Sequence, residues 1–158
     1  MIKIFDNKME ELEIKIMDYL ENIYPLENYS AFGLKMEEIY FQTSEHAFQY
    51  LKFYKTHPDI ANEIIDAYSP NDARNIGQKH GNLKPSNWLD VKYKKMEKVL
   101  RLKVAQNTEV KEKLLATNDN IIAEFCVDQD TEWGIDENNN GENNLGKILM
   151  KIRDELKK

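Results

Sequence analysis

The chain has 158 residues, of which 41% are hydrophobic and 32% are charged, and its net charge at pH 7 is −6. This length suits one domain of common size. The composition is too apolar for a disordered chain and too interrupted by charge for a membrane protein. The excess of 28 acidic over 22 basic residues excludes a general attraction of the whole molecule for phosphate backbones. The single cysteine, Cys126, excludes an internal disulfide, and charged residues soon follow the N-terminus in place of an apolar signal sequence. We therefore expect a soluble cytoplasmic protein.

The spacing of apolar residues predicts a mainly α-helical, single compact domain with room for a few short strands. Residues 1–27 are predicted to form an N-terminal helix, ended by Pro25, that precedes or packs on a domain of residues 28–158. The helix that begins at Pro58 is predicted to bury an apolar stripe that extends to Tyr68. The other predicted helices follow Thr43 or Ser44, run from Ser69-Pro70 through Ile76, and span residues 88–106, 108–116 and 145–156.

Three segments lack helical periodicity. Residues 28–42 are predicted as irregular loop with short extended pieces. Residues 121–127 are β-branched and apolar, which fits either a short strand or a buried helical turn. Residues 128–144 are rich in Asn, Gly and Asp and exceed the ordinary length of a connection, which indicates a functional or a mobile loop.

The charges are unevenly distributed along the chain. Residues 84–103 contain seven basic side chains against two acidic ones, and residues 124–142 contain seven acidic side chains and no basic one. Two solvated surfaces are the more common explanation of such runs. The alternative is a basic surface for a phosphorylated ligand beside a carboxylate-rich loop.

Carboxylates and aromatic residues are the candidates for chemistry, because no glycine-rich phosphate loop, HExxH pair or zinc knuckle is present. Glu45 lies in the first turn of a predicted helix, where stabilisation by the helix dipole is the more common reason for an acid. Asp130 lies in the predicted loop of residues 128–144, where an acidic side chain can serve either to keep the loop soluble or to form part of a site. Trp88 begins the longest predicted helix and could pack on the core, whereas Trp133 has little apolar company in its loop. Together they favour a site that stacks a flat ring and handles a proton or cation, with no metal or cofactor.

These motifs resemble those of a known family. Residues 43–53, TSEHAFQYLKF, resemble the Glu-His-x-Phe-Gln-x-x-Lys-Phe signature of the NADAR family, the YbiA-like N-glycosidases. Four later stretches keep the family order, namely Ser69-Pro through Ala73-Arg-Asn-Ile-Gly, Asn87-Trp-x-x-Val-Lys with Met96, Leu114-Leu-Ala-Thr, and Asp130-x-x-Trp-Gly leading to Gly141-x-Asn-x-Leu-Gly-x-x-Leu-Met-x-x-Arg. The resemblance covers about residues 29–156, which is nearly the whole chain.

The resemblance implies a mostly helical fold and an enzyme that hydrolyses N-glycosidic bonds to ribose. The substrates it implies are ribosylaminopyrimidine phosphate intermediates of riboflavin synthesis, or ADP-ribose linked to a nucleobase such as guanine. It assigns Glu45 and Asp130 as the catalytic carboxylates. The substrate-binding residues that it assigns are Trp88, Trp133, Lys52, Asn143 and Phe32.

The sequence departs from the family pattern in several places. Gln78 stands where many members carry Arg, and the connection from Phe32 to Glu45 is shortened. Ser30-Ala31-Phe32 stands where the family has Ser-Asn-Phe, and Ile135-Asp136 replace a further glycine after Trp133-Gly. A non-catalytic module that binds ADP-ribose or a nucleotide would keep the tryptophans but need neither carboxylate, so the two carboxylates favour an enzyme. The expected partner is a small ribosylated or ADP-ribosylated molecule, or an ADP-ribosylated nucleic acid. Binding to a membrane is not expected.

Overall fold

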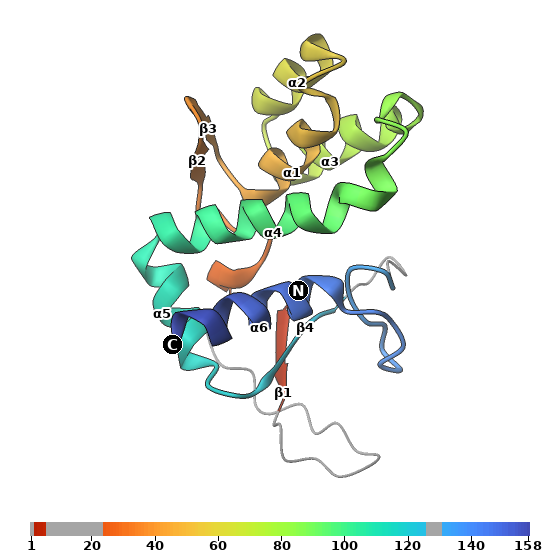
Figure 1. Cartoon of the computed structure of the whole chain (residues 1–158). Coiled ribbons are helices and arrows are strands. Elements are labelled where there is room, and N and C mark those ends of the chain that lie inside the picture. Colours follow the sequence, from red (N-terminus) through yellow and green to blue (C-terminus); the bar gives the residue numbers. More distant parts are fainter. Residues whose placement is uncertain (1, 6–23, 126–130) are drawn as a thin grey trace. The chain divides into compact units, whose positions relative to one another are not determined.

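The computed structural model describes residues 2–5, 24–125 and 131–158 (Figure 1). The chain divides into two compact units, which we describe separately. The central unit is Asn28–Asn107, and the terminal unit combines Met1–Glu27 with Thr108–Lys158. Most of the N-terminal helix predicted within residues 1–27 falls on residues 6–23, which lie outside the described residues. At its start, Ile2–Phe5 form a strand and not a helix.

The central unit consists of a β-hairpin and four α-helices among its described residues. Its elements are β2 (Leu34–Met36), β3 (Ile39–Phe41), α1 (Ser44–Phe53), α2 (Pro58–Ile65), α3 (Pro70–Lys79), the 3₁₀ turn η2 (Gly81–Leu83) and α4 (Trp88–Gln106). The two strands pair antiparallel, with Leu34 opposite Phe41. Helix α1 contacts α2, α3 and α4, and Figure 1 shows α1, α2 and α3 grouped beside the long α4. Helix α1 is therefore the buried centre of this unit.

The helix starts in this unit follow from local capping. The hydroxyl of Thr43 accepts a hydrogen bond from the backbone N–H of His46 at 3.3 Å and so caps α1, and Ser69 caps α3 in the same way. Pro58 occupies the first position of α2, where a missing N–H is tolerated. The prediction that Tyr68 is buried is wrong, because α2 ends at Ile65 and the side chain of Tyr68 is 95% exposed.

The C-terminal end of α4 holds the segment that leads into the hairpin. The amide of Gln106 bonds the backbone N–H and C=O of Lys35 at 2.6 and 2.7 Å. The ammonium of Lys103 donates to the hydroxyl of Ser30 at 2.7 Å. Lys103 is only 1% exposed, so its assignment to a basic surface is wrong. It lies three and four residues beyond the buried Leu100 and Val99, which places it on the inward face of the helix.

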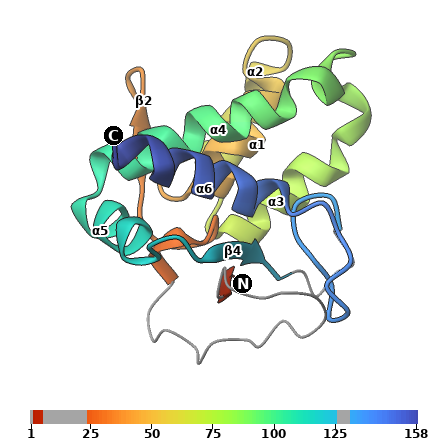
Figure 2. The same ribbon diagram turned by 60° about the horizontal axis from the view of Figure 1, so that its bottom comes forward.

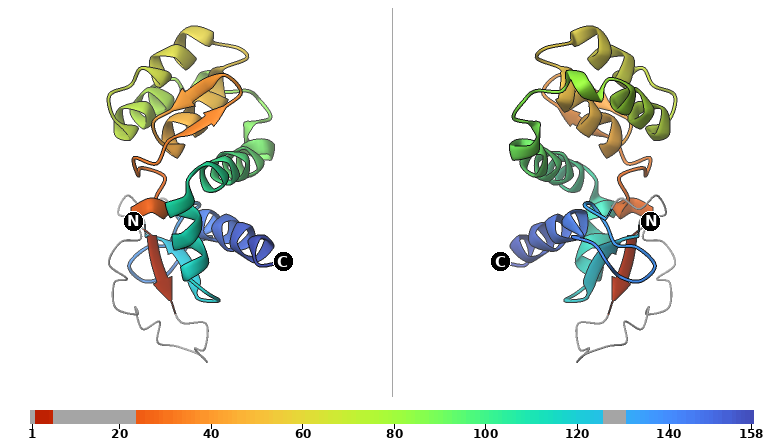
Figure 3. Two further views of the ribbon diagram at one scale, coloured as in Figure 1. Left: turned by 90° about the vertical axis from the view of Figure 1, so that its left-hand side faces the viewer. Right: turned by 90° about the vertical axis from the view of Figure 1, so that its right-hand side faces the viewer.

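The terminal unit contains a two-stranded sheet and two α-helices in the part that the structure describes. Its elements are β1 (Ile2–Phe5), the 3₁₀ turn η1 (Tyr24–Leu26), α5 (Thr108–Ala116), β4 (Ile121–Glu124) and α6 (Asn144–Leu156). Strands β1 and β4 pair antiparallel from Ile2 opposite Glu124 to Phe5 opposite Ile121, and α6 packs against β4 (Figures 2 and 3). Of the two alternatives for residues 121–127, the strand is confirmed for Ile121–Glu124, and residues 126 and 127 lie outside the described residues. The prediction of a mainly α-helical fold with a few short strands is also confirmed.

Close packing fixes α6 against β4. A Cβ atom on Gly146 would overlap the backbone oxygen of Ile122, so only glycine lets the helix approach this closely. The side-chain amide of Asn143 accepts from the backbone N–H of Glu124 at 3.1 Å and donates to the backbone oxygen of Ile122 at 2.9 Å. These bonds attach the start of α6 to the strand.

Candidate functional site

One face of α1 gathers the residues that the site requires. Glu45, Phe48, Gln49 and Lys52 recur at intervals of three and four, which places them side by side on a helix. The side chains of Glu45, Phe48 and Gln49 are 4 to 6% exposed. The helix therefore presents a carboxylate, an amide and an amine along a largely buried apolar surface.

Glu45 has partners that a solvated helix-start acid does not need. Its Oε1 atom accepts a hydrogen bond from Nε2 of Gln49 at 2.6 Å, and its backbone N–H donates to the backbone oxygen of Asn28 at 3.2 Å. A buried carboxylate is strongly disfavoured unless hydrogen bonds or opposite charges compensate for lost water. The helix dipole alone thus does not account for this residue.

The amide of Gln49 is satisfied at one end only. Its Oε1 atom is buried and has no hydrogen-bond partner in the part of the chain that the structure describes, and such an unpaired group costs about 1–3 kcal/mol. This oxygen faces Gly77 of α3, where a Cβ atom would overlap it. The backbone of α3 at Gly77 therefore packs directly against the side-chain amide of Gln49, which in turn hydrogen-bonds Glu45.

Lys52 lies one turn beyond Gln49 and carries an unusual amine. Burial lowers the pKa of Lys52 from 10.5 to about 8, an effect that the negative charge of Glu45 partly opposes and the positive charges of Lys84, Arg74 and Lys92 reinforce. The amine lies 5.5 Å from the ring centre of Phe48 and 5.8 Å from that of Trp88. A substantial fraction of this amine is neutral at mildly alkaline pH.

Trp88 begins α4 and is 4% exposed. Its ring centre lies 5.4 Å from that of Phe48, with the planes inclined by 50°, which is a favourable aromatic packing geometry. The structure thus gives Trp88 the core-packing role that was the alternative to a pocket role. It also places the ring beside Lys52, and stacking on a ligand stays a prediction.

The other predicted site residues are placed as follows. Phe32 is half-buried just before β2 in the central unit. Trp133 and Asn143 belong to the terminal unit, where Trp133 is half-buried and its backbone oxygen accepts from Leu145 at 3.1 Å. Asp130 lies outside the described residues. The site whose geometry is described is therefore the one that Glu45, Lys52 and Trp88 form in the central unit.

Sequence reasoning missed two residues of this site. Gln49 belongs to the signature that carries the resemblance, and its position four residues after Glu45 could have predicted the hydrogen bond between them. Gly77 also belongs to a stretch that carries the resemblance, but its proximity to Gln49 could not be predicted because it depends on how α3 packs against α1.

His46, the neighbour of Glu45, is 1% exposed and fastens α1 to the segment after α2. Its Nε2 atom lies 3.2 Å from the backbone oxygen of Ala67, which can only accept, so Nε2 carries the proton. Its Nδ1 atom then accepts from the hydroxyl of Thr43 at 2.8 Å. These contacts require the neutral ring.

The buried ring of His46 predicts a loss of stability in acid. Burial lowers its pKa, although the bond to Ala67 and the charge of Asp72 oppose the shift. The unfolded chain therefore binds more protons as the pH falls through about 6.5, and the free energy of unfolding falls with it. Denaturation of the wild type and His46→Gln between pH 7 and 5 should show a steeper loss in the wild type. His80→Gln, on the half-exposed C-cap of α3, is the control, and equal slopes in all three proteins would contradict the assignment.

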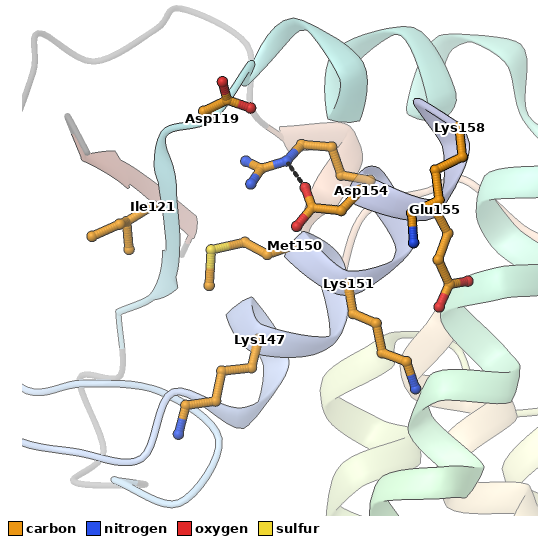
Figure 4. Close-up of a pocket in the computed structure, with 9 residues that line it drawn as sticks. Asp119, Ile121, Lys147, Met150, Lys151, Asp154, Glu155 and Lys158 are labelled. Atoms are coloured by element: carbon orange, nitrogen blue, oxygen red, sulfur yellow. Dashed lines mark hydrogen bonds and ion pairs between the residues drawn. The ribbon is translucent and has the colours of Figure 1, made fainter. Parts of the chain in front are cut away.

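A separate hollow of about 540 Å³ lies on the terminal unit, along α6 and the adjoining end of β4 (Figure 4). Ile121 and Met150 contribute apolar surface to it, and lysines and acids of α6 surround them. None of the predicted site residues that the structure describes lines this hollow. Its mixture of charges gives it no preference for one class of ligand.

No helix among the described residues is long and apolar enough to cross a membrane.

The NADAR domain family model matches residues 10–157, and the chain belongs to this family. Among its curated relatives is the N-glycosidase YbiA of Shigella boydii, which is 32% identical over 148 residues, covering 94% of this chain and 91% of that protein. A riboflavin biosynthesis protein of Vibrio vulnificus is 28% identical over 138 residues, covering 87% of this chain and 35% of that protein. The NMR structure of YbiA from Escherichia coli matches with a TM-score of 0.75 at 33% identity, covering 84% of this chain and 77% of that one.

Proposed function

We infer that this member of the NADAR family is a hydrolase of N-glycosyl bonds, and we propose that it cleaves the bond between C1 of a ribose and a base or amine nitrogen. The N-glycosidase name of its relatives supports the reaction class. The observation that carries the proposal is the buried carboxylate of Glu45, which accepts a hydrogen bond from Gln49 and interacts favourably with the positive charge of Lys52. This arrangement suits a reaction in which positive charge develops on a bound sugar.

The reaction needs a negative charge beside C1 and a base for water. As the C1–N bond breaks, its electron pair leaves with the nitrogen, which takes up a proton, and the ribose gains oxocarbenium character. A fixed carboxylate stabilises that cation, and a second carboxylate removes a proton from the water whose oxygen bonds to C1. We propose that Glu45 and Asp130 share these two tasks, as paired acids do in glycoside hydrolases.

The remaining predicted site residues are proposed to bind the substrate or to favour the ionised form of Glu45. Lys52 favours the ionised form of Glu45 through its charge, and the amine is also suited to meet a ligand phosphate. Trp88 and Trp133 are proposed to stack the flat base, an interaction worth about 1–3 kcal/mol for each base. Phe32 and Asn143 complete the proposed substrate-binding set.

The proposed substrates are ribosylaminopyrimidine phosphates of riboflavin synthesis, or ADP-ribose joined to a nucleobase such as guanine. The riboflavin name of the Vibrio relative favours the first class. The second class includes an ADP-ribosylated nucleic acid as partner, for which the exposed lysines of α4, Lys94 and Lys98, offer a local positive charge. We propose the cytoplasm as the site of action, because one cysteine in 158 residues fits a reducing compartment.

A cationic ribose mimic separates the enzyme from a non-catalytic binding module. If Asp130 lies against the ribose, an iminoribitol-type ligand should bind more tightly than a neutral ribose ligand, because it supplies the charge of the transition state. Asp130→Asn should abolish that preference and leave binding of the neutral ligand intact. Calorimetric titration of both proteins with both ligands provides the measurement. Equal discrimination by the two proteins would remove Asp130 from the site and favour the binding module.

A further inference from the structure

Gln49 and Gly77 are buried at the site, yet the chemistry above gives them no task. The amide nitrogen of Gln49 donates to Oε1 of Glu45 at 2.6 Å. Because an ionised carboxylate only accepts hydrogen bonds, Gln49 must turn its nitrogen toward Glu45 and its oxygen away. The observed orientation, with the nitrogen toward Glu45, is thus the one that suits an ionised carboxylate.

The oxygen end of Gln49 indicates that this orientation does not serve stability. Among the described residues, the buried Oε1 atom finds no hydrogen-bond donor. An apolar side chain of the same size would fill the space without leaving a polar atom unpaired. A polar group kept under those conditions calls for a specific explanation, and its short bond to Glu45 provides one.

Helix α3 is shaped to admit the amide. A Cβ atom on Gly77 would overlap Oε1 of Gln49 and lie 2.8 Å from its Cδ atom. Any side chain at position 77 must therefore push the amide of Gln49, with little room to yield because Gln49 is 4% exposed. The backbone of α3 consequently sets the position of the group that holds Glu45 on α1.

We propose that Gln49 is a positioning residue that holds the carboxylate of Glu45 ionised and in a fixed place before substrate binds, and that Gly77 provides the space this requires. This inference rests on the proposed function, since it assigns a role toward the same carboxylate. A hydrogen bond to the charged form favours that form. A carboxylate fixed in advance also stabilises a developing cation without reorganisation during the reaction.

The pH dependence of kcat/KM for hydrolysis of a ribosylaminopyrimidine phosphate tests the proposal. Gln49→Met keeps the length of the side chain and removes the donor. We expect kcat/KM at pH 7 to fall at least tenfold, mainly through kcat, with the acid limb of the profile displaced upward by about one pH unit. Gly77→Ala should change both quantities in the same direction. Gln42→Met, at an exposed amide, and Gly81→Ala, at a glycine with open space around it, are the matched controls.

The proposal would be overturned if Gln49→Met had the same pH profile of kcat/KM as the wild type. It would also be overturned if kcat/KM fell by the same factor at every pH, in proportion to the unfolded fraction of the variant. The proposal is also testable without turnover, by following the carboxyl carbon of Glu45 by NMR through an acid titration and assigning it with Glu45→Gln. Its midpoint should move to higher pH in Gln49→Met, and an unchanged midpoint would contradict the inference. If the wild type hydrolyses none of the proposed substrates while the midpoint moves, the proposed function fails and the positioning role stands.

Discussion

Replacing Glu45 with glutamine is expected to reduce turnover by about 100-fold or more, the usual effect of removing an acid–base group. The amide keeps the size of the side chain and can still hydrogen-bond Gln49, but it carries no charge to set against the ribose cation. The free energy of unfolding should change by only about 1 kcal/mol, the scale of a helix-end charge. Steady-state kinetics and chemical denaturation of the same preparation measure the two effects.

The matched control for this change is Glu63→Gln on α2, an exposed carboxylate with ordinary surroundings. Glu45→Gln should also lower the pKa of Lys52 further below 8, because the charge of Glu45 raises it in the wild type. Near-normal turnover in a folded Glu45→Gln protein would mean that the carboxylate has a structural role only.

Replacing Lys52 with methionine is expected to stabilise the protein while it impairs activity. The lowering of the Lys52 pKa from 10.5 to about 8 corresponds to about 3 kcal/mol at 1.36 kcal/mol per unit. Between pH 8 and 10.5 the unfolded chain binds the additional proton, so the contribution of this group to the free energy of unfolding rises with pH in that window. Below pH 8 the charged amine exerts its full destabilising effect, which methionine removes.

Denaturation of Lys52→Met and of Lys94→Met, an exposed lysine on α4, measures this difference. At pH 7 only Lys52→Met should gain stability, by up to about 3 kcal/mol, and its advantage over the wild type should shrink as the pH approaches 10.5. Its turnover should fall because Glu45 loses a compensating charge. A residue that weakens the fold and is needed for turnover is typical of a functional site. A destabilised Lys52→Met protein with full activity would contradict this account.

Much of the fold was predictable from local signals. Residues 88–106 and 108–116 form helices with the predicted bounds, and Thr43 caps α1 as expected, because spacing and capping are properties of neighbouring residues. Strand β1 was missed, because its partner β4 is more than a hundred residues away in the sequence. The burial of Lys103 was also missed, because a lysine within a basic run gives no sign of the helix face on which it lies.

The candidate site was predictable only in part. The signature placed Glu45 and Lys52 on one helix, and the structure adds the bond from Gln49 and the lowered pKa of the amine. For Asn143 the structure adds a role that the resemblance did not imply, while its part in substrate binding stays a prediction. Its side-chain amide is bound at both ends to the backbone of β4, a fastening role that the motif alone does not reveal.

The most direct test of N-glycosyl hydrolysis by this protein is to quantify the products that the wild type releases. A ribosylaminopyrimidine phosphate and an ADP-ribosylated guanine are each incubated with the protein, and the released base and ribose product are quantified by chromatography. We expect at least one substrate to be consumed over many turnovers, with base and ribose product released in equal amounts and with release suppressed in Glu45→Gln. Tight binding of both compounds with release no faster than in buffer would contradict this expectation and identify the chain as a binding module.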